Sequence, residues 1–307
     1  MAHAHAHDHH FHVSADADRG RLRLALGLIL GFMLVEVVAG IAASSLALLS
    51  DAAHMLTDAG ALALALGAMR LAARPAHGAF TFGLARAEIL SAQFNGATLL
   101  VLGILIAVEG VQRVIEPPDV EGGVVLVVAI AGIAVNLAAT WVLARADRSS
   151  LNVEGAFQHL LTDLAAFVFT AIAGLVVLTT GFGEADGIAA LVVAAIMLRA
   201  AVSLLLASGR VFLEAAPRDM DVGEIGTALA AAPGVVEVHD LHVWEVSSGF
   251  PALAAHVIVG RDHDCHDARL VLQAVLRERF GIAHTTLQMD HEGGELVQIE
   301  PPPSPQP

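Results

Sequence analysis

Two five-residue stretches of this 307-residue chain share one pattern, a histidine followed four residues later by an aspartate. They are His54-Met55-Leu56-Thr57-Asp58 and His159-Leu160-Leu161-Thr162-Asp163. Side chains four residues apart lie on one face of a helix, so each stretch presents an imidazole and a carboxylate together. If the two faces meet, they supply two nitrogens and two oxygens, which suits tetrahedral zinc. The pattern predicts a metal site, and the alternative is an interhelical hydrogen-bond clamp between the same side chains.

The helices that must carry these residues are strongly apolar. Hydrophobic residues make up 56% of the chain, which excludes a soluble globular fold and is typical of a protein that crosses the membrane several times. Six stretches are suited to span a bilayer: residues 22–43, 45–69, 86–112, 122–144, 156–180 and 187–209. The two repeats fall in the second and fifth spans, where ionisable residues are costly and mark a site or a pathway.

Other polar residues within the spans have two interpretations. They either line a water path or tie helices together, and the sequence does not choose between these roles. The residues concerned are Asn95, Glu109, Asn136 and Arg199.

Arginines are distributed unevenly among the loops. The loops on one side of the membrane carry only Arg113. The loops on the other side, together with the two ends of the membrane domain, carry Arg19, Arg21, Arg23, Arg70, Arg74, Arg86, Arg145, Arg148, Arg210 and Arg218. Basic residues flanking spans stay on the cytoplasmic side, so we expect both termini in the cytoplasm.

Charge and cysteine content exclude two further classes. The formal net charge is −15 and the chain contains no lysine, whereas nucleic-acid binding needs clustered basic residues. The one cysteine, Cys265, excludes an internal disulfide framework and a multi-cysteine zinc site. We therefore expect a lipid bilayer as the surroundings and no nucleic-acid partner.

The pattern changes after the sixth span. Residues 222–232 and 267–280 have helical periodicity, whereas 235–246, 252–259 and 285–290 read as strands. The order αββαβ predicts an α+β domain of the ferredoxin or metallochaperone type, with its helices on one face of a small sheet. We expect four parts: a His-rich cytoplasmic tail at 1–20, a six-helix transmembrane domain at 21–211, this cytoplasmic domain at 212–293 and a disordered Pro-rich tail at 294–307.

Several motifs together resemble one known family. They are the run from Ser45 through His54 to Asp58, Phe82-Gly83 followed by Arg86-Ala87-Glu88, the run from Asn152 to Asp163, and His239-Asp240-Leu241-His242-Val243-Trp244. Over nearly its whole length the chain resembles the cation diffusion facilitators, proton-coupled zinc exporters, and in particular their bacterial zinc-exporting branch. The resemblance implies a transport site formed by His54, Asp58, His159 and Asp163, the version associated with zinc. It also implies a homodimer, formed through the cytoplasmic and transmembrane domains, in a bacterial inner membrane.

The resemblance also points to metal sites in the cytoplasmic domain. The matching positions are His239, His256, His266 and Asp290. Gln288 stands where some relatives have a histidine, so a complete two-metal site stays open, and a set of packed, hydrogen-bonded histidines is the alternative. Phe80 and Leu84 occupy loop positions that are histidines in some relatives, so we expect no strong site in that loop and an exposed His77.

Six more histidines crowd the N-terminus: His3, His5, His7, His9, His10 and His12. An alternating histidine tract is a weak, flexible metal-collecting segment. An affinity tag is the alternative interpretation.

The predicted site suggests a mechanism. Zinc needs neutral imidazole and ionised carboxylate, so protons and metal compete for the same donors. We therefore expect not an enzyme but an antiporter that exports zinc against protons by alternating access, and Cd²⁺, Co²⁺ and Fe²⁺ suit similar sites. A membrane metalloprotease is disfavoured because the chain has no HExxH motif and four protein ligands leave no position for water. A metal-gated channel or zinc sensor without proton counter-flow is the remaining alternative.

Overall fold

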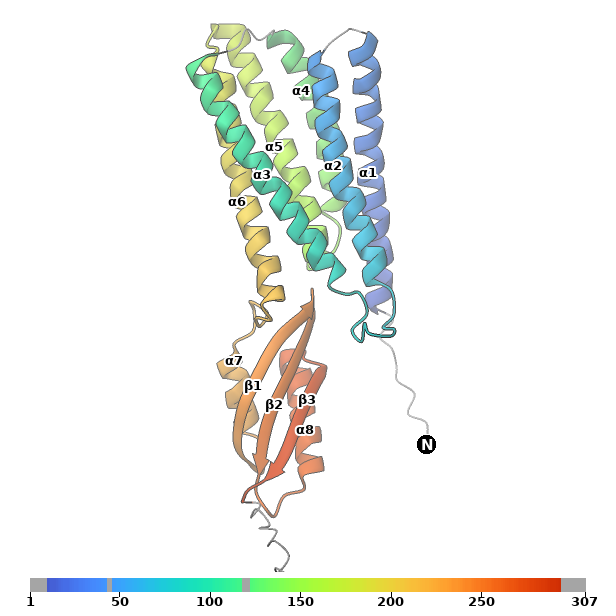
Figure 1. The fold of residues 1–307 in the computed structure, drawn as a ribbon, viewed down its shortest axis with the longest axis vertical. Helices are drawn as coiled ribbons and strands as arrows, with labels where there is room; N and C mark the ends of the chain where they lie inside the picture. Colours follow the sequence, from blue (N-terminus) through green and yellow to red (C-terminus); the bar gives the residue numbers. More distant parts are fainter. Residues whose placement is uncertain (1–9, 43–45, 118–121, 294–307) are drawn as a thin grey trace, which may run out of the picture. The chain divides into compact units, whose positions relative to one another are not determined.

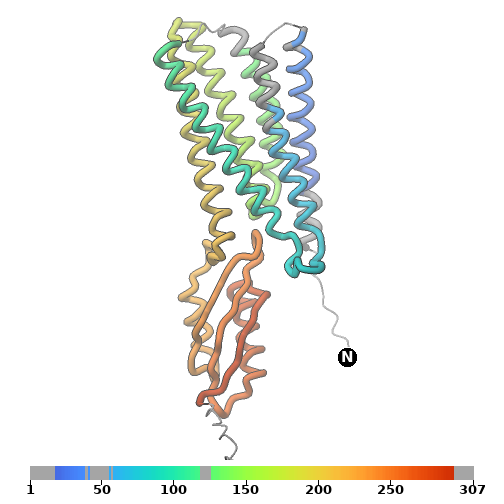
Figure 2. The backbone as a smooth tube through the Cα atoms, in the orientation of Figure 1, coloured from blue at the N-terminus to red at the C-terminus, as the bar shows by residue number. Residues whose placement is uncertain are grey.

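The computed structural model describes residues 10–42, 46–117 and 122–293 (Figures 1 and 2). The predicted Pro-rich tail and His3, His5, His7 and His9 lie outside the described residues. The chain divides into two compact units, a helical unit that ends at Leu213 and a smaller unit that begins at Glu214.

Six long helices make up the helical unit. They are α1 (His10–Ala42), α2 (Leu46–Ala72), α3 (Ala87–Ile115), α4 (Gly122–Leu143), α5 (Leu151–Thr180) and α6 (Glu184–Phe212). Each predicted span overlaps one of these helices, but α1 and α5 begin before residues 22 and 156. Hydropathy marks only the apolar part of a helix, whereas the backbone stays helical through polar residues until a loop interrupts it.

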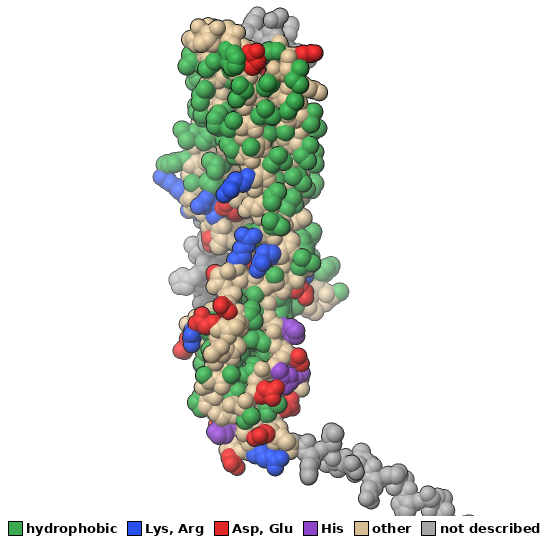
Figure 3. Space-filling model, turned by 90° about the vertical axis from the view of Figure 1, so that its left-hand side faces the viewer, with side chains coloured by type: hydrophobic (Ala, Val, Ile, Leu, Met, Phe, Trp, Pro, Cys, Tyr) green, Lys and Arg blue, Asp and Glu red, His purple; other side chains and the backbone are tan. Residues whose placement is uncertain are grey.

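The helical unit has the surface of a protein that lies in a bilayer. Within the described part of the chain, four helices are long and apolar enough to cross a membrane: Ala87–Ile115, Leu126–Leu143, Leu151–Thr180 and Glu184–Phe212. Large apolar side chains point outward from them, among them Leu105 and Leu178, which are each more than half exposed. Figure 3 shows hydrophobic side chains covering the face of the long helices. Water does not favour such a surface, and lipid does.

Glycines bring α3 and α6 into close contact. Gly96, Gly103 and Gly110 recur every seven residues on α3, so they lie along one stripe. A Cβ atom added at these glycines would lie 3.0–3.1 Å from carbon atoms of Leu205, Leu198 and Leu191 on α6. Small residues that let two helices approach closely are a common device of membrane bundles.

The smaller unit has the element order αββαβ that the sequence predicts. It contains α7 (Val222–Ala230), β1 (Val235–Ser247), β2 (Phe250–Val259), α8 (Cys265–Phe280) and β3 (His284–His291). The strands form one sheet in the order β1-β2-β3, and β2 and β3 run parallel.

Both helices of the smaller unit pack on one face of its sheet. Alternate residues of β2, from Leu253 to Val259, are buried in one apolar cluster with Leu229 of α7 and Leu272 of α8. Because strand side chains alternate between faces, His256 of β2 lies on the opposite, open face. The covered face therefore forms the core, and the open face is available to polar side chains.

Candidate metal centre

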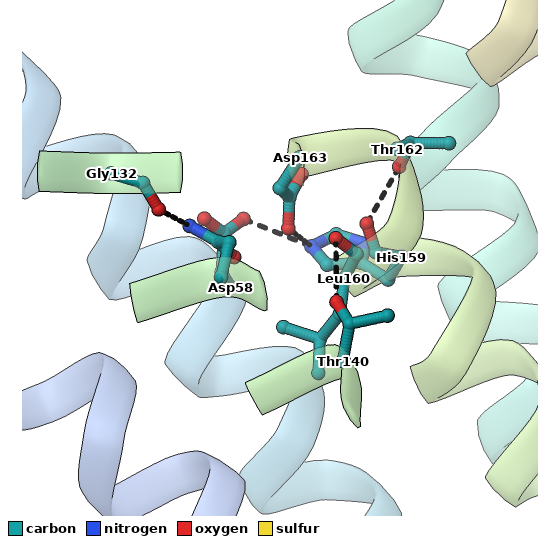
Figure 4. Close-up of polar contacts among 8 residues, drawn as sticks. Asp58, Gly132, Thr140, His159, Leu160, Thr162 and Asp163 are labelled. Atoms are coloured by element: carbon teal, nitrogen blue, oxygen red, sulfur yellow. Dashed lines mark hydrogen bonds and ion pairs between the residues drawn. The ribbon is translucent and has the colours of Figure 1, made fainter. Parts of the chain in front are cut away.

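Three of the four residues predicted for the membrane site come together between α2 and α5. Asp58 lies on α2, and His159 and Asp163 lie one turn apart on α5. All three are buried, with exposed fractions of 5%, 1% and 9%. Their potential ligand atoms all lie within 4.8 Å of one another. Figure 4 shows the three side chains pointing toward a common centre.

The distances among these atoms suit a small tetrahedral cation. His159 Nε2 lies 2.9 Å from Asp58 Oδ1 and 3.9 Å from Asp163 Oδ2. Zinc bonds of about 2.0–2.1 Å set ligand atoms roughly 3.3 Å apart at the corners of a tetrahedron. The two observed separations lie on either side of that value, so shifts of about half an ångström would complete the geometry.

The fourth predicted ligand cannot be placed in the same way. His54 lies in α2, four residues before Asp58, so the backbone puts both residues on one helix face. The side chain of His54 lies outside the described residues, as do those of His10 and His12 in α1.

Hydrogen bonds fix the two helices that carry the site. The Asn152 amide of α5 donates to the Ala65 carbonyl of α2 at 2.9 Å, and Asn152 is fully buried. The Thr162 hydroxyl donates to the His159 carbonyl at 2.7 Å (Figure 4). The bond from Asn152 to Ala65 links α5 to α2. Asn152 lies two helical turns before His159 on α5.

The charges of the centre require a positive partner. Among the described residues, the two carboxylates are paired only with His159. Ionised carboxylates buried in a low dielectric are strongly unfavourable unless they are paired, protonated or bound to a metal. A divalent cation balances two carboxylates, and protons do the same when the cation leaves.

A second cluster of possible ligands lies on the open face of the smaller sheet. His239 and Asp240 of β1 and His256 of β2 bring their ligand atoms within 4.8 Å of one another. The two imidazole rings are 5.3 Å apart, and Asp240 Oδ2 lies 3.8 Å from His256 Nδ1. All three residues are at least partly exposed.

The other predicted positions in this unit lie elsewhere. His266 is in the first turn of α8, where Arg269 approaches its ring nitrogen at 3.3 Å. Asp290 of β3 accepts a hydrogen bond from Gln288 at 3.2 Å. Gln288 lies opposite His256 in the strand register, so the residue that departs from the family pattern is the immediate neighbour of this cluster.

Asp240 is a candidate ligand that the sequence analysis did not select. Strict alternation places adjacent residues on opposite faces of a strand. Asp240 has φ +49°, a left-handed conformation that interrupts the alternation and lets it share a face with His239. The sequence signal was present in His239-Asp240-Leu241-His242, but the backbone irregularity was not visible in it.

The exposed loop histidine behaves as the sequence analysis expected. His77 is exposed, and its Nδ1 lies 3.1 Å from the Pro75 carbonyl oxygen. It belongs to neither of the two clusters of candidate ligands found among the described residues.

Two family models match the chain. The model of the cation efflux transmembrane domain matches residues 22–213. The model of the cation efflux protein cytoplasmic domain matches residues 217–292. The boundary between the two matches coincides with the boundary between the two structural units.

Curated relatives match over most of their own length. The zinc transporter ZitB of Escherichia coli K12 is 40% identical over 269 residues, which cover 87% of this chain and 85% of the relative. The cadmium, cobalt and zinc/H(+)-K(+) antiporter of Bacillus subtilis 168 is 35% identical, with 86% of each chain covered. The metal cation efflux system protein CzcD of Cupriavidus metallidurans is 38% identical, with 84% of this chain and 82% of the relative covered.

Proposed function

The chain belongs to the cation efflux family, the cation diffusion facilitators, and we propose that it is a proton-coupled antiporter that exports zinc from the cytoplasm. As a member of this family it is a multi-pass membrane transporter of metal cations and not an enzyme. The observation that carries the proposal is the buried cluster of Asp58, His159 and Asp163. His54, from the same helix face as Asp58, completes the proposed site.

Zinc is proposed as the principal substrate because of the donor set. Two imidazoles and two carboxylates match its preferred number and types of ligand. The relatives support the choice, since ZitB is named a zinc transporter and the Bacillus protein a cadmium, cobalt and zinc antiporter. Cd²⁺, Co²⁺ and Fe²⁺ are proposed as further cargo because they accept similar nitrogen and oxygen donors.

Proton coupling follows from the burial of the site. Zinc binds the neutral imidazole and the ionised carboxylates, so its arrival expels protons and its departure requires them back. We propose that α2 and α5 present the site alternately to the two sides of the membrane, and that protons from outside displace the metal. The antiporter name of the Bacillus relative supports this mechanism.

The proposed orientation places both termini in the cytoplasm, with all six long helices crossing a bacterial inner membrane. The arginine distribution supports this assignment. The smaller unit then lies in the cytoplasm. We propose that two copies of the chain form a homodimer through their cytoplasmic and transmembrane domains. Its match to the family's cytoplasmic domain supports that role.

Additional metal binding is proposed for two cytoplasmic segments. In the smaller unit, His239 and His256 with Asp240 form the core of a weaker site, to which His266 and Asp290 contribute only after rearrangement. At the N-terminus, the six histidines from His3 to His12 collect metal weakly.

Zinc flux into proteoliposomes under an imposed pH gradient tests the proposal. We expect uptake that saturates with zinc, depends on the gradient and disappears in Asp163→Ala. Uptake that persists at full rate without a gradient would identify a metal-gated channel instead. Normal uptake by Asp163→Ala would refute the assigned site and favour the hydrogen-bond clamp.

A further inference from the structure

Two rows of residues with identical spacing run along facing parts of α3 and α5. On α3 they are Glu88, Ser91 and Asn95, and on α5 they are Asn152, Gly155 and His159. The spacing i, i+3, i+7 places each row on one helix face. The rows approach each other at Gly155, where an added Cβ would lie 3.8 Å from the Asn95 amide nitrogen and 3.1 Å from the Leu204 side chain of α6.

Several polar atoms of these rows are buried without a hydrogen-bond partner. Asn95 and Asn152 are 0% exposed and Ser91 is 3% exposed. Among the described residues, the Ser91 hydroxyl, both polar atoms of the Asn95 amide and the Asn152 carbonyl oxygen have no hydrogen-bond partner. Buried polar groups are nearly always bonded to protein or to ordered water. Three such residues along one line therefore point to water as the missing partner.

A buried serine elsewhere shows that the bundle can satisfy such groups with its own atoms. Ser208 of α6 is 0% exposed, and its hydroxyl bonds to the Gln93 side chain and to the Leu204 carbonyl. Gln93 lies on α3 between Ser91 and Asn95. Among the described residues of α3, the buried polar side chains without a hydrogen-bond partner are those of Ser91 and Asn95.

The two ends of the line have different chemistry. At one end, near the first residues of both helices, the Ser150 hydroxyl donates to the partly buried Glu88 carboxylate at 3.1 Å. At the other end lies His159 of the metal centre, whose Nδ1 also has no partner among the described residues. The seven residues from Asn152 to His159 correspond to about 10 Å of helix. The line is long enough to join the metal centre to that end of the bundle.

We propose that Glu88, Ser91, Asn95, Asn152 and Gly155 line a hydrated passage through which a divalent cation reaches His159 and Asp163. This inference rests on the proposed transport function and adds the route of entry. The Glu88 carboxylate attracts the cation, and neutral amide and hydroxyl oxygens replace its water ligands one at a time. Neutral oxygens bind weakly enough to release the ion onward.

Asn95→Leu tests the passage by removing the polar group while keeping the branching of the side chain. We expect zinc flux to fall about tenfold, because an apolar side chain cannot replace water ligands, while zinc affinity at equilibrium changes less than about twofold. The melting temperature should change little, since the Asn95 amide makes no hydrogen bond to another described part of the protein. A lower melting temperature together with weaker zinc binding would assign Asn95 a structural role and overturn the proposal. Ser208→Ala is the matched control and should lower the melting temperature, because its hydroxyl is already bonded.

Thiol labelling tests hydration without relying on transport. In a Cys265→Ser background, which removes the one native cysteine, Asn95→Cys should react with a small water-soluble methanethiosulfonate at least about tenfold faster than Leu99→Cys. Leu99 is the matched control because it lies one turn further along α3, is equally buried and packs among apolar residues. Equally slow labelling of both cysteines would overturn the passage. Labelling of Asn95→Cys, combined with no zinc flux in the Cys265→Ser parent that keeps Asn95, would refute the proposed function while leaving the passage in place.

Discussion

The helical unit and the smaller unit each gather histidine and aspartate side chains within 4.8 Å, but in opposite surroundings. In the helical unit, Asp58, His159 and Asp163 are at most 9% exposed. In the smaller unit, the His239 and His256 side chains are 41% exposed and that of Asp240 is 66% exposed. The two clusters therefore differ in burial and in charge, since the helical unit gathers two carboxylates and one imidazole and the smaller unit gathers one carboxylate and two imidazoles.

Burial changes what an empty cluster requires. Water solvates the exposed carboxylate of Asp240, and salt screens it, so that cluster is stable without any ligand. The two buried carboxylates of the helical unit have no such solvent and need a cation or protons at all times. Under the proposed mechanism, obligatory exchange of metal for protons is a property of the buried cluster, whereas the exposed cluster can bind and release metal without a counter-ion.

The same substitution in both clusters gives the largest expected contrast. Asp58→Asn keeps the shape of the side chain and can still hydrogen-bond to His159, but it removes a negative ligand. We expect zinc flux in proteoliposomes to fall more than about 100-fold, since even residues that only orient a ligand commonly cost 10–100-fold. Asp240→Asn is the control and should lower flux less than about threefold, because it lies in the exposed cluster.

That pair of variants also separates the metal site from a hydrogen-bond clamp. A clamp would tolerate Asp58→Asn because the amide preserves the contact with His159. Full flux in that variant would therefore show that the buried cluster of Asp58, His159 and Asp163 holds the helices together and does not carry transport.

Zinc itself should stabilise the protein mainly through the buried cluster. At a zinc concentration about 100 times its Kd, binding to the folded state adds about 2.7 kcal/mol of stability. Thermal unfolding in detergent, with zinc or with a chelator, measures this shift. We expect Asp163→Ala to lose most of it and His256→Ala to keep most of it. The opposite ranking of the two variants would make the exposed cluster the tighter site.

The two clusters also differ in how much of them was predictable. The His-X-Leu-Thr-Asp repeat predicted that Asp58 of α2 and His159 and Asp163 of α5 lie close together, and the structure places them so. This was possible because the regular periodicity of a helix fixes which side chains lie on one face. Asp240 could not be selected in this way, because its positive φ breaks the alternation on which strand predictions rest. Regular elements thus reveal their sites in sequence, and irregular ones do not.

The fold was predictable to a similar degree. Hydropathy located each long helix but misplaced the starts of α1 and α5, where polar residues continue the helix. The order αββαβ followed from periodicity, whereas the parallel pairing of β2 with β3 depends on contacts between distant residues. The surroundings of Asn95 could not be predicted from the sequence because they depend on which helices lie opposite, and the structure places Asn95 near Gly155 of α5.

Removing one imidazole from the exposed cluster should have a smaller effect. His256→Ala deletes the ring that faces His239 at 5.3 Å, so we expect a weaker class of bound zinc to disappear. Equilibrium dialysis of the full-length protein against zinc, at fixed ionic strength, measures how many zinc ions bind tightly and how many bind weakly. Flux should fall less than about threefold, because His256 is not one of the ligands of the proposed transport site in the helical unit. A loss of flux as large as that of Asp58→Asn would mean that the cytoplasmic cluster controls transport.

Acid should affect the two units through different groups, and this gives the smallest expected effect. Asp264 begins α8, and its carboxylate accepts hydrogen bonds from the backbone N–H groups of His266 and Asp267, which lower its pKa. The charged form therefore stabilises the folded unit above the unfolded-state pKa of about 3.9, and this contribution is lost as the pH falls through the lower folded-state pKa.

Asp264→Asn isolates this acid response. Asparagine also caps helices well, so stability near pH 7 should change little, whereas the loss of stability below about pH 4 should become shallower. Thermal unfolding of the full-length protein at a series of pH values measures the difference. The pH dependence of zinc flux should not change, because the proposed exchange of metal for protons takes place at the buried carboxylates of the helical unit. A shifted transport profile would show that the capping carboxylate of α8 takes part in coupling, and the two regions would then no longer be separable by burial alone.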